Sequence, residues 1–341
     1  MRRHPLRVVI DGRPLVGNRT GIGVHAAEIA RRLGVEPPPL IGSHAEIEDR
    51  TGIEGCRFAV HRYPLGVLWQ QLAMPGLEGD VVWGPHGTLP LSLGKPAVVS
   101  IHDFTSITMP GRHRLKTVFS FNLFIGESLA MASRIAAVSR ATAEEAMRGF
   151  GVPARKIEIV PNGVDEFFSP GGEEGNYILY VGTLEPRKGV ADLIAVWESL
   201  PAPRPRLVLC GDPGWRTSIA NEAVEIAGFV TRERLRDLYR GAMAFVYPSR
   251  FEGFGIPPLE AMACGAPVIA SRTGAIPEYA GEAALTVRPG DRGELRAALV
   301  RLLGDAGLRR ELRARGAMRA AAYSWDESAR RMTELLVEAA R

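Results

Sequence analysis

The sequence predicts an α/β protein built from two doubly wound parallel sheets that face each other across a cleft. Short β-branched runs alternate with longer helical patterns, which is typical of parallel strands joined by crossover helices. The same alternation begins again after residue 170, and a turn-rich stretch at 169–175 separates the two halves. A chain of 341 residues is also too long for one ordinary core and fits two domains of roughly 150 residues each.

Taken in chain order, the hydrophobic patterns name individual strands and helices. In the first half, the expected strands are 6–10, 97–101 and 134–138, and the expected helix is 22–33. In the second half, strands and helices are expected in alternation at 178–181, 190–200, 207–210, 232–242, 244–247, 257–263 and 268–270. Three helices should follow, from 294 to about 303, at 308–322 and at 325–340.

These elements predict the domain boundaries. We place one domain at 1–165 and the second at 166–323, with the turn-rich stretch after residue 165 as the linker. The last helix, at 324–341, is expected to pack back on the first domain.

Composition restricts the compartment and the partners. Cys56, Cys210 and Cys264 have no spacing typical of a zinc site or a disulfide framework, so a reducing cytoplasm is expected. The apolar run at 6–10 is too short for a signal peptide, and the sequence has no long uncharged apolar stretch that would span a membrane. The net charge of +4 lies entirely in the first half, which fits a phospholipid surface and is too weak to indicate nucleic acid.

The strongest functional signal is a glycine loop before a helix. The strand pattern at 244–247 leads into Glu252-Gly253-Phe254-Gly255, and a helix pattern begins at Pro257. Proline suits the first turn of a helix, and Gly265 can close the helix with a positive φ. Glycines let the backbone approach a ligand, and the N–H groups at a helix start favour an anion. The alternative is an ordinary loop without a ligand.

A second loop of the same kind carries two adjacent cations. Gly182 and the pair Arg187-Lys188 lie between a strand pattern and a helix pattern. Arginine offers a planar fork to phosphate and lysine a compact charge, although solvated surface charge would also explain them. Together the two loops predict a diphosphate site. Glu260 in the following helix would then suit the two hydroxyls of a ribose.

These residues resemble the donor motif of retaining glycosyltransferases of family 4, which have the GT-B fold of two Rossmann-like domains. Glu252 and Glu260 are separated by seven residues, and Arg187-Lys188 resembles the family's phosphate-binding pair. Asn162-Gly163-Val164-Asp165 resembles its interdomain hinge, and His102-Asp103 and Ala137-Val138-Ser139 resemble landmarks of its N-terminal domain. The resemblance runs from about residue 6 to 330 and is strongest to bacterial mannosyltransferase-like members of polysaccharide pathways.

The resemblance implies roles for the matching residues. Glu260 would hold the ribose, Glu252 and the following backbone would meet the sugar and its phosphates, and His102 would line the reaction centre. The candidate catalytic residues are His102, Glu252, Arg187 and Lys188. The candidate donor-binding residues are Gly21, Gly23, Gly182, Phe229, Val230, Gly253, Phe254, Gly255 and Glu260.

Two of these assignments have structural alternatives. Gly21 and Gly23 resemble a glycine loop beneath the donor phosphates, but a tight turn would give the same pattern. Phe229 and Val230 would frame the base, although Phe229 in the core is the other interpretation.

The implied activity is a retaining, metal-independent hexosyltransferase. It would move a hexose, with mannose from GDP-mannose as the best match, to a glycan or lipid-linked acceptor in cell-surface polysaccharide or glycolipid synthesis. The residues do not distinguish GDP-, UDP-, ADP- and dTDP-sugars. The chain contains no Asp-x-Asp, so cations and helix N-termini are expected to oppose the diphosphate, with no metal and no cofactor.

Other functions remain open from the sequence. A nucleotide-sugar epimerase of the same fold would share the diphosphate site, and a non-catalytic nucleotide- or glycan-binding module would bind the donor without turnover. A dinucleotide dehydrogenase is disfavoured because no Gly-x-Gly-x-x-Gly follows the first strand.

Contact with a membrane also remains open. The stretch at 112–124 mixes cations with phenylalanines, which fits either a helix on a membrane surface or an ordinary helix with an apolar core side. The expected location is the cytoplasm, either free or at the inner face of the cytoplasmic membrane.

Overall fold

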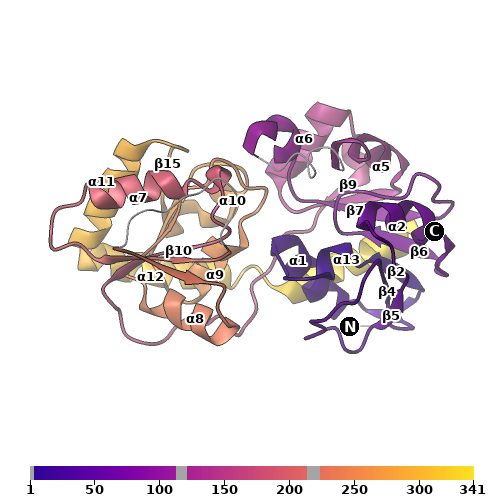
Figure 1. The fold of residues 1–341 in the computed structure, drawn as a ribbon, viewed down its shortest axis with the longest axis horizontal. Coiled ribbons are helices and arrows are strands. Elements are labelled where there is room, and N and C mark those ends of the chain that lie inside the picture. The colour runs from indigo at the N-terminus through magenta and orange to yellow at the C-terminus, as the bar shows by residue number, and fades with distance from the viewer. Residues whose placement is uncertain (1–3, 113–120, 213–222) are drawn as a thin grey trace. The chain divides into compact units, whose positions relative to one another are not determined.

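The computed structural model describes residues 4–112, 121–212 and 223–341, and the chain divides into two compact units (Figure 1). Unit 1 comprises Met1–Gly163 together with Ser324–Arg341, and unit 2 comprises Val164–Tyr323. Most of the cationic and aromatic stretch at 112–124 lies outside the described residues.

Unit 1 contains a seven-stranded parallel sheet in the order β5-β4-β2-β6-β7-β8-β9. All residues of β2, β6 and β7 are buried, as expected when helices cover both faces of a parallel sheet. The strand order reverses between β2 and β6. The strands are β2 (Val8–Asp11), β4 (Leu40–Ser43), β5 (Arg57–Val60), β6 (Val81–Gly84), β7 (Ala97–Ile101), β8 (Arg134–Ala137) and β9 (Ile157–Ile159), and β1 (His4–Pro5) pairs with β3 (Val35–Glu36) in a separate small sheet.

The C-terminal helix α13 (Trp325–Ala339) belongs to unit 1 and packs on α1 (Gly21–Ala30), as Figure 1 shows in yellow and indigo. It begins at Trp325 because the Ser324 side chain accepts a hydrogen bond from the Glu327 N–H. The other helices among the described residues of this unit are α2 (Gly66–Leu72), α3 (Thr105–Thr108), α5 (Ile125–Met131) and α6 (Arg140–Phe150), with single 3₁₀ turns η1 (Arg13–Leu15), η2 (Met74–Gly76), η3 (Pro110–Arg112) and η4 (Ala154–Lys156).

Unit 2 contains a six-stranded parallel sheet in the order β12-β11-β10-β13-β14-β15, which reverses between β10 and β13. Its strands are β10 (Tyr177–Val181), β11 (Arg206–Cys210), β12 (Val224–Gly228), β13 (Ala244–Tyr247), β14 (Val268–Ser271) and β15 (Ala284–Val287). Its helices are α7 (Val190–Glu198), α8 (Arg232–Gly241), α9 (Ile256–Ala263), α10 (Ile276–Ala280), α11 (Arg292–Gly304) and α12 (Ala306–Ala320), with 3₁₀ turns η5 (Pro186–Lys188) and η6 (Gly281–Ala283).

The predicted fold class, two doubly wound parallel α/β sheets, is confirmed. Every strand and helix named from the sequence is present, with ends displaced by about three residues or fewer. Strands β1, β3, β4, β5, β6 and β9 of unit 1 and β12 and β15 of unit 2 were not named from the sequence. In β12 and β15, only one or two residues are fully buried and there is no continuous apolar run. None of the described helices combines the length and the apolar character needed to cross a lipid bilayer.

Gly189 of unit 2 is required by both its backbone angle and its surroundings. Gly189 precedes α7 with φ +71°, and a Cβ there would lie 2.2 Å from the carbonyl oxygen of Pro248. Gly228 has a similar φ of +65°, but a Cβ there would meet no atom within 4 Å.

We therefore predict that Gly189→Ala destabilises unit 2 far more than Gly228→Ala does. Both substitutions place alanine in the left-handed region, at a cost of about 1–3 kcal/mol. Only Gly189→Ala also forces the β13 loop to move. Urea denaturation of the two variants measures the difference, and equal losses in free energy of unfolding would contradict the close backbone approach.

Candidate functional site

Two loops of unit 2 begin where the strand order of its sheet reverses. One leaves β10 and contains η5, and the other leaves β13 and leads into α9. Ligands of doubly wound sheets bind outside the carboxyl ends of the strands at such a reversal. The loops are joined by two hydrogen bonds: the Arg250 N–H donates to the Arg187 carbonyl at 2.8 Å, and Arg187 Nη1 donates to the Phe251 carbonyl at 3.2 Å.

The side chains of Arg187, Lys188 and Glu252 meet between these loops. Lys188 Nζ lies 2.7 Å from Glu252 Oε1, and Arg187 Nη1 lies 3.4 Å from the same oxygen. Lys188 also donates to the hydroxyl of Tyr247, the last residue of β13, at 3.0 Å. The sequence suggested either phosphate binding or solvated surface charge for the two cations. With side chains only 12% and 13% exposed, the solvated-surface alternative is wrong.

Glu252 is ionised in this arrangement although only 6% of it is exposed. Burial alone would raise the pKa of its carboxyl group, but the charges of Lys188 and then Arg187 outweigh that effect and lower the pKa below its ordinary value. Arg187, Lys188 and Glu252 together carry one net positive charge, which favours an anion beside them.

A further loop fixes the backbone of Glu252. The Ala275 N–H donates to the Glu252 carbonyl at 3.1 Å, and the neighbouring Gly274 has φ +53°. A Cβ on Gly274 would lie 1.7 Å from that carbonyl oxygen, so only glycine allows this approach.

The helix after the glycine loop offers fewer backbone donors than the sequence pattern suggested. Gly255 precedes α9 with φ +84°, and Gly265 follows its end with φ +78°, as predicted. The helix begins at Ile256, however, so Pro257 and Pro258 are its second and third residues and have no N–H. An anion here would meet the N–H groups of Phe254, Gly255 and Ile256.

The second glutamate of the motif contacts a different element. The Tyr239 hydroxyl, from α8, donates to Glu260 Oε2 at 2.9 Å. Burial, followed by the Glu260 charge, raises the pKa of Tyr239 well above its ordinary value, so the phenol keeps its proton. Glu260 is thus half-buried and hydrogen-bonded to Tyr239, whereas Glu252 accepts a hydrogen bond from Lys188.

The remaining candidates in unit 2 lie after neighbouring strands. Gly182 follows β10, and its carbonyl oxygen would lie 2.2 Å from a Cβ on Gly211, so two loop backbones touch here. Phe229 and Val230 follow β12. The side chain of Phe229 is 68% exposed, so the alternative that places it in the core is wrong.

In unit 1, His102 follows β7 and is half-buried. Its Nε2 lies 2.8 Å from the Pro85 carbonyl, so this nitrogen carries the hydrogen. Burial lowers the pKa of His102, which keeps the ring neutral. The neutral ring therefore presents Nδ1 as a hydrogen-bond acceptor.

Beside His102 lies a buried chain of hydrogen bonds that the sequence did not reveal. Trp83 Nε1 donates to Ser100 Oγ at 2.9 Å, and Ser100 Oγ lies 3.3 Å from His25 Nε2. His25 Nδ1 lies 2.7 Å from Asn162 Oδ1 in the sequence that resembles a hinge. Because Asn162 Oδ1 only accepts, His25 donates to it from Nδ1, and Nε2 of the neutral ring accepts from Ser100. The His25 and His102 rings meet edge to face at 4.8 Å.

Gly21 and Gly23 form the first turn of α1, so the tight-turn alternative is wrong. A Cβ on Gly23 would lie 2.5 Å from the Pro14 carbonyl oxygen, which gives this glycine a packing role against η1. Gly21 is exposed, with open space where a Cβ would be.

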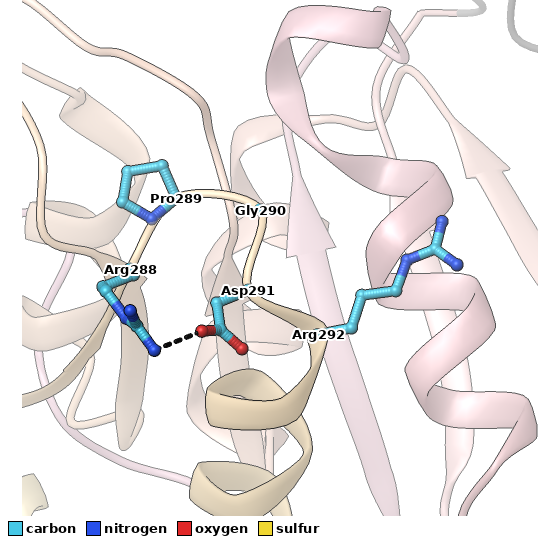
Figure 2. Close-up of a pocket in the computed structure, with 5 residues that line it drawn as sticks. All are labelled: Arg288, Pro289, Gly290, Asp291 and Arg292. Atoms are coloured by element: carbon cyan, nitrogen blue, oxygen red, sulfur yellow. Dashed lines mark ion pairs between the residues drawn. The ribbon is translucent and has the colours of Figure 1, made fainter.

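A second polar cluster of unit 2 also escaped sequence reasoning. Asp192 in α7 is buried and forms ion pairs with Arg250 and, at 2.8 Å, with Arg292. Figure 2 shows Arg292 at the edge of a surface hollow, where Arg288 and Asp291 pair at 2.7 Å. Because Arg250 belongs to the same loop as Glu252, the contacts of Asp192 tie that loop to α7 and α11. Acidic residues in a first helical turn usually serve the helix dipole, so the sequence offered no separate signal.

The cysteines and the acidic residues show no metal centre in the described ranges. No group of three or more His, Cys, Asp or Glu side chains is placed there to hold an ion. Cys56, Cys210 and Cys264 are free and buried.

Two family models match most of the chain. The model described as Glycosyl transferases group 1 matches residues 165–319, and the model described as Glycosyltransferase Family 4 matches residues 58–166. O-antigen chain mannosyltransferase B of Escherichia coli is 29% identical over 94% of this chain and 97% of its own length. The MMP alpha-(1->4)-mannosyltransferase of Mycolicibacterium hassiacum is 36% identical over 56% of this chain, which matches about half (51%) of that relative.

Solved structures share the fold. HepE of Anabaena, in complex with UDP and glucose, superposes with a TM-score of 0.79 at 17% identity, over 98% of this chain and 100% of that chain. Sucrose-phosphate synthase from Thermosynechococcus elongatus gives a TM-score of 0.79 at 22% identity, over 98% and 99%.

The buried His25 predicts how the stability of unit 1 depends on pH. Burial, followed by the proximity of His102, lowers the pKa of His25 to about 3, against an ordinary value of 6.5. Between pH 6.5 and about 3, His25 is therefore protonated in the unfolded state but stays neutral in the folded state. The contribution of the neutral ring to the free energy of unfolding is fully present above pH 6.5. It is lost as the pH falls from 6.5 towards 3, by up to about 1.4 kcal/mol per pH unit.

We predict that His25→Asn, which keeps a donor near the position of Nδ1, reduces this acid sensitivity. Between pH 7 and pH 5 the variant should lose about 2 kcal/mol less free energy of unfolding than the native chain. Urea titrations at the two pH values measure it, with the exposed His61→Asn as the control. If His25→Asn and the native chain lost the same free energy, His25 would not be buried as a neutral ring.

Proposed function

This chain belongs to family 4 of the glycosyltransferases and has the GT-B fold, and from that premise we propose that it transfers mannose from GDP-mannose with retention of anomeric configuration and without a divalent metal. The acceptor is a glycan or a lipid-linked glycan in cell-surface polysaccharide or glycolipid synthesis, and the enzyme works in the cytoplasm or at the inner face of its membrane. The observation that carries the proposal is the group of Arg187, Lys188 and Glu252 at the strand reversal of unit 2.

In this proposal, Arg187 and Lys188 stabilise the leaving diphosphate. When the bond between the anomeric carbon and the diphosphate oxygen breaks, the electron pair leaves with the diphosphate and negative charge grows there. Fixed cations that need no reorganisation stabilise such charge most effectively. Glu252 already holds Lys188 at 2.7 Å, so the cation is in position before the donor arrives.

The proposed metal independence follows from the same charges. Two cations and the N–H groups of the glycine loop before α9 supply the positive field that a bound divalent ion would otherwise provide. Glu260 in α9 and the loop with Phe229 and Val230 are the proposed contacts for the ribose and the base. His102, with Nδ1 as a hydrogen-bond acceptor, is the proposed contact for the sugar from unit 1, and Gly21 and Gly23 are proposed near the phosphates.

Support for mannose comes from the relatives. The Escherichia coli relative that matches nearly the whole length of both chains is named as an O-antigen chain mannosyltransferase, and the Mycolicibacterium hassiacum relative is also named as a mannosyltransferase. HepE was solved with UDP and glucose, but at 17% identity it informs on the fold alone.

One assay tests the donor, the stereochemistry and the metal requirement. The chain is incubated with GDP-mannose and a methyl mannoside acceptor in excess EDTA, and the coupling at the product's anomeric carbon is read by NMR. We expect an α-linked product at an undiminished rate. A β-linked product would exclude retention, and loss of activity in EDTA that Mg²⁺ or Mn²⁺ restores would exclude the metal-free mechanism.

A melting screen with GDP, UDP, ADP and dTDP identifies the base independently of turnover. GDP at 100 times its dissociation constant should stabilise the chain by about 2.7 kcal/mol. A larger shift with another nucleotide would replace GDP in the proposal.

We predict that Arg187→Ala and Lys188→Ala each lower kcat/KM by about ten- to a hundredfold. A charge-assisted hydrogen bond contributes roughly 1.5–3 kcal/mol, and the loss should include kcat because the diphosphate charge is greatest in the transition state. Arg187→Lys should restore only part of the activity, because a point charge does not reproduce a planar fork.

The matched control is Arg206→Ala, which removes an exposed cation from β11 that pairs with Glu225 and lies over the Tyr177 ring, away from Glu252. Melting curves of all variants establish that they fold. Kinetics within twofold of the native chain, for folded variants of Arg187 and Lys188, would remove both residues from the active site.

A further inference from the structure

Unit 1 has its own strand reversal, and polar side chains line it. The order of its sheet reverses between β2 and β6. At the carboxyl ends of four adjacent strands stand His44 after β4, Arg13 after β2, His86 after β6 and His102 after β7. The sequence did not mark the first three, because isolated histidines and a single arginine match no motif.

A buried ion pair between Asp11 and Arg13 lies among these side chains. Asp11, the last residue of β2, is fully buried and pairs with Arg13 through both carboxylate oxygens, with Arg13 Nη2 at 2.6 Å from Oδ2. Gln70 from α2 donates to Asp11 Oδ2 at 3.0 Å, and Arg13 donates to Thr88 Oγ1 at 2.9 Å. The guanidinium of Arg13 is therefore held in one orientation, and its charge is opposed.

Two imidazoles beside this pair retain unused hydrogen-bonding groups. His44 Nδ1 is buried without a hydrogen-bond partner among the described residues, and His86, after β6, is half-buried. A Cβ on Gly66 would lie 3.1 Å from His44 Cε1 and 3.2 Å from Arg13 Cδ, so the two side chains border the same point. Burial, then the Arg13 charge, lowers the pKa of His44, and the same causes lower that of His86 to about 4, so both rings are neutral.

Unused donors and acceptors of this kind point to a ligand, because a buried polar atom without a partner costs free energy. The ligand class follows from the charge. Arg13 is paired, Gln70 and Thr88 are neutral, and both imidazoles are uncharged, so an anionic ligand would find no unpaired cation in the group. A neutral imidazole both donates and accepts, which suits hydroxyl groups.

We infer that His44, Arg13 and His86 bind the neutral, hydroxyl-rich part of the acceptor, a glycan end without phosphate or carboxylate, and that Asp11 and Gln70 position Arg13. The inference rests on the proposed transfer to a carbohydrate hydroxyl. His86 is adjacent in sequence to Pro85, whose carbonyl accepts the hydrogen bond from His102. The acceptor site thus lies beside the residue proposed to contact the transferred sugar.

Binding measured without a donor tests this inference separately from turnover. Methyl α-D-mannopyranoside and mannose 6-phosphate are titrated into the whole chain, and saturation-transfer NMR gives each Kd. We expect the mannoside to bind, and His44→Ala and His86→Ala each to raise its Kd by about tenfold, equivalent to about 1.4 kcal/mol. His86→Asn, which keeps a donor and an acceptor, should bind better than His86→Ala, and the exposed His61→Ala should match the native chain.

The alanine variants should fold, because no described hydrogen bond uses either imidazole, and the melting shift with GDP checks this in the same samples. Mannoside binding that is unchanged in both variants would overturn the inference. So would no detectable binding to the native chain, or tighter binding of mannose 6-phosphate than of the mannoside. Intact mannoside binding together with no transfer from GDP-mannose would instead refute the proposed donor and leave this site standing.

Discussion

The ion pair between Lys188 and Glu252 joins two loops that leave adjacent strands of one parallel sheet. A carboxylate as buried as Glu252 is stable only when it is paired, so the loop after β13 depends on the cations of the loop after β10. The surrounding backbone follows from that contact. Gly189 lets its loop touch Pro248, and Gly274 lets a third loop reach the Glu252 carbonyl. Side-chain charge and backbone proximity therefore specify the same arrangement, which leaves one positive charge in excess at the strand reversal.

The sequence predicted the parts of the fold that depend on local pattern. Apolar, β-branched strands such as β10 and β13 are buried along their length, so periodicity and run length identified them. The cation pair, the glycine loop and the helix after it were recognisable because their residues are contiguous. The edge strand β12 was not, since only the first of its five residues, Val224, is buried. The number of helical donors was overestimated because Pro257 and Pro258, the second and third residues of α9, have no N–H.

What the sequence could not supply are contacts between distant residues. Asp11 and Gln70 are separated by 59 positions, and their hydrogen bond forms only when α2 lies beside the end of β2. His25 and Asn162 are separated by 137 positions and meet only when α1 closes over the sheet of unit 1. Single polar residues of this kind carry no periodic signal, and their protonation depends on burial that only the folded chain provides. For the same reason, the tautomers of His25 and His102 follow from their partners and not from their sequence neighbours.

The two sheets share a topology but differ in the charge at their strand reversals. In unit 2, Arg187 and Lys188 exceed Glu252 by one charge, whereas in unit 1 Asp11 cancels Arg13 and the imidazoles are neutral. Group transfer from a nucleotide sugar makes opposite demands on its two partners. The leaving diphosphate gains negative charge and is stabilised by cations, while the attacking hydroxyl is neutral and would gain nothing from an unpaired cation that attracts competing anions. In the transfer that we propose, one scaffold serves both partners by changing a few residues after the strands, because the carboxyl edge of a parallel sheet tolerates either charge without altering the core beneath it.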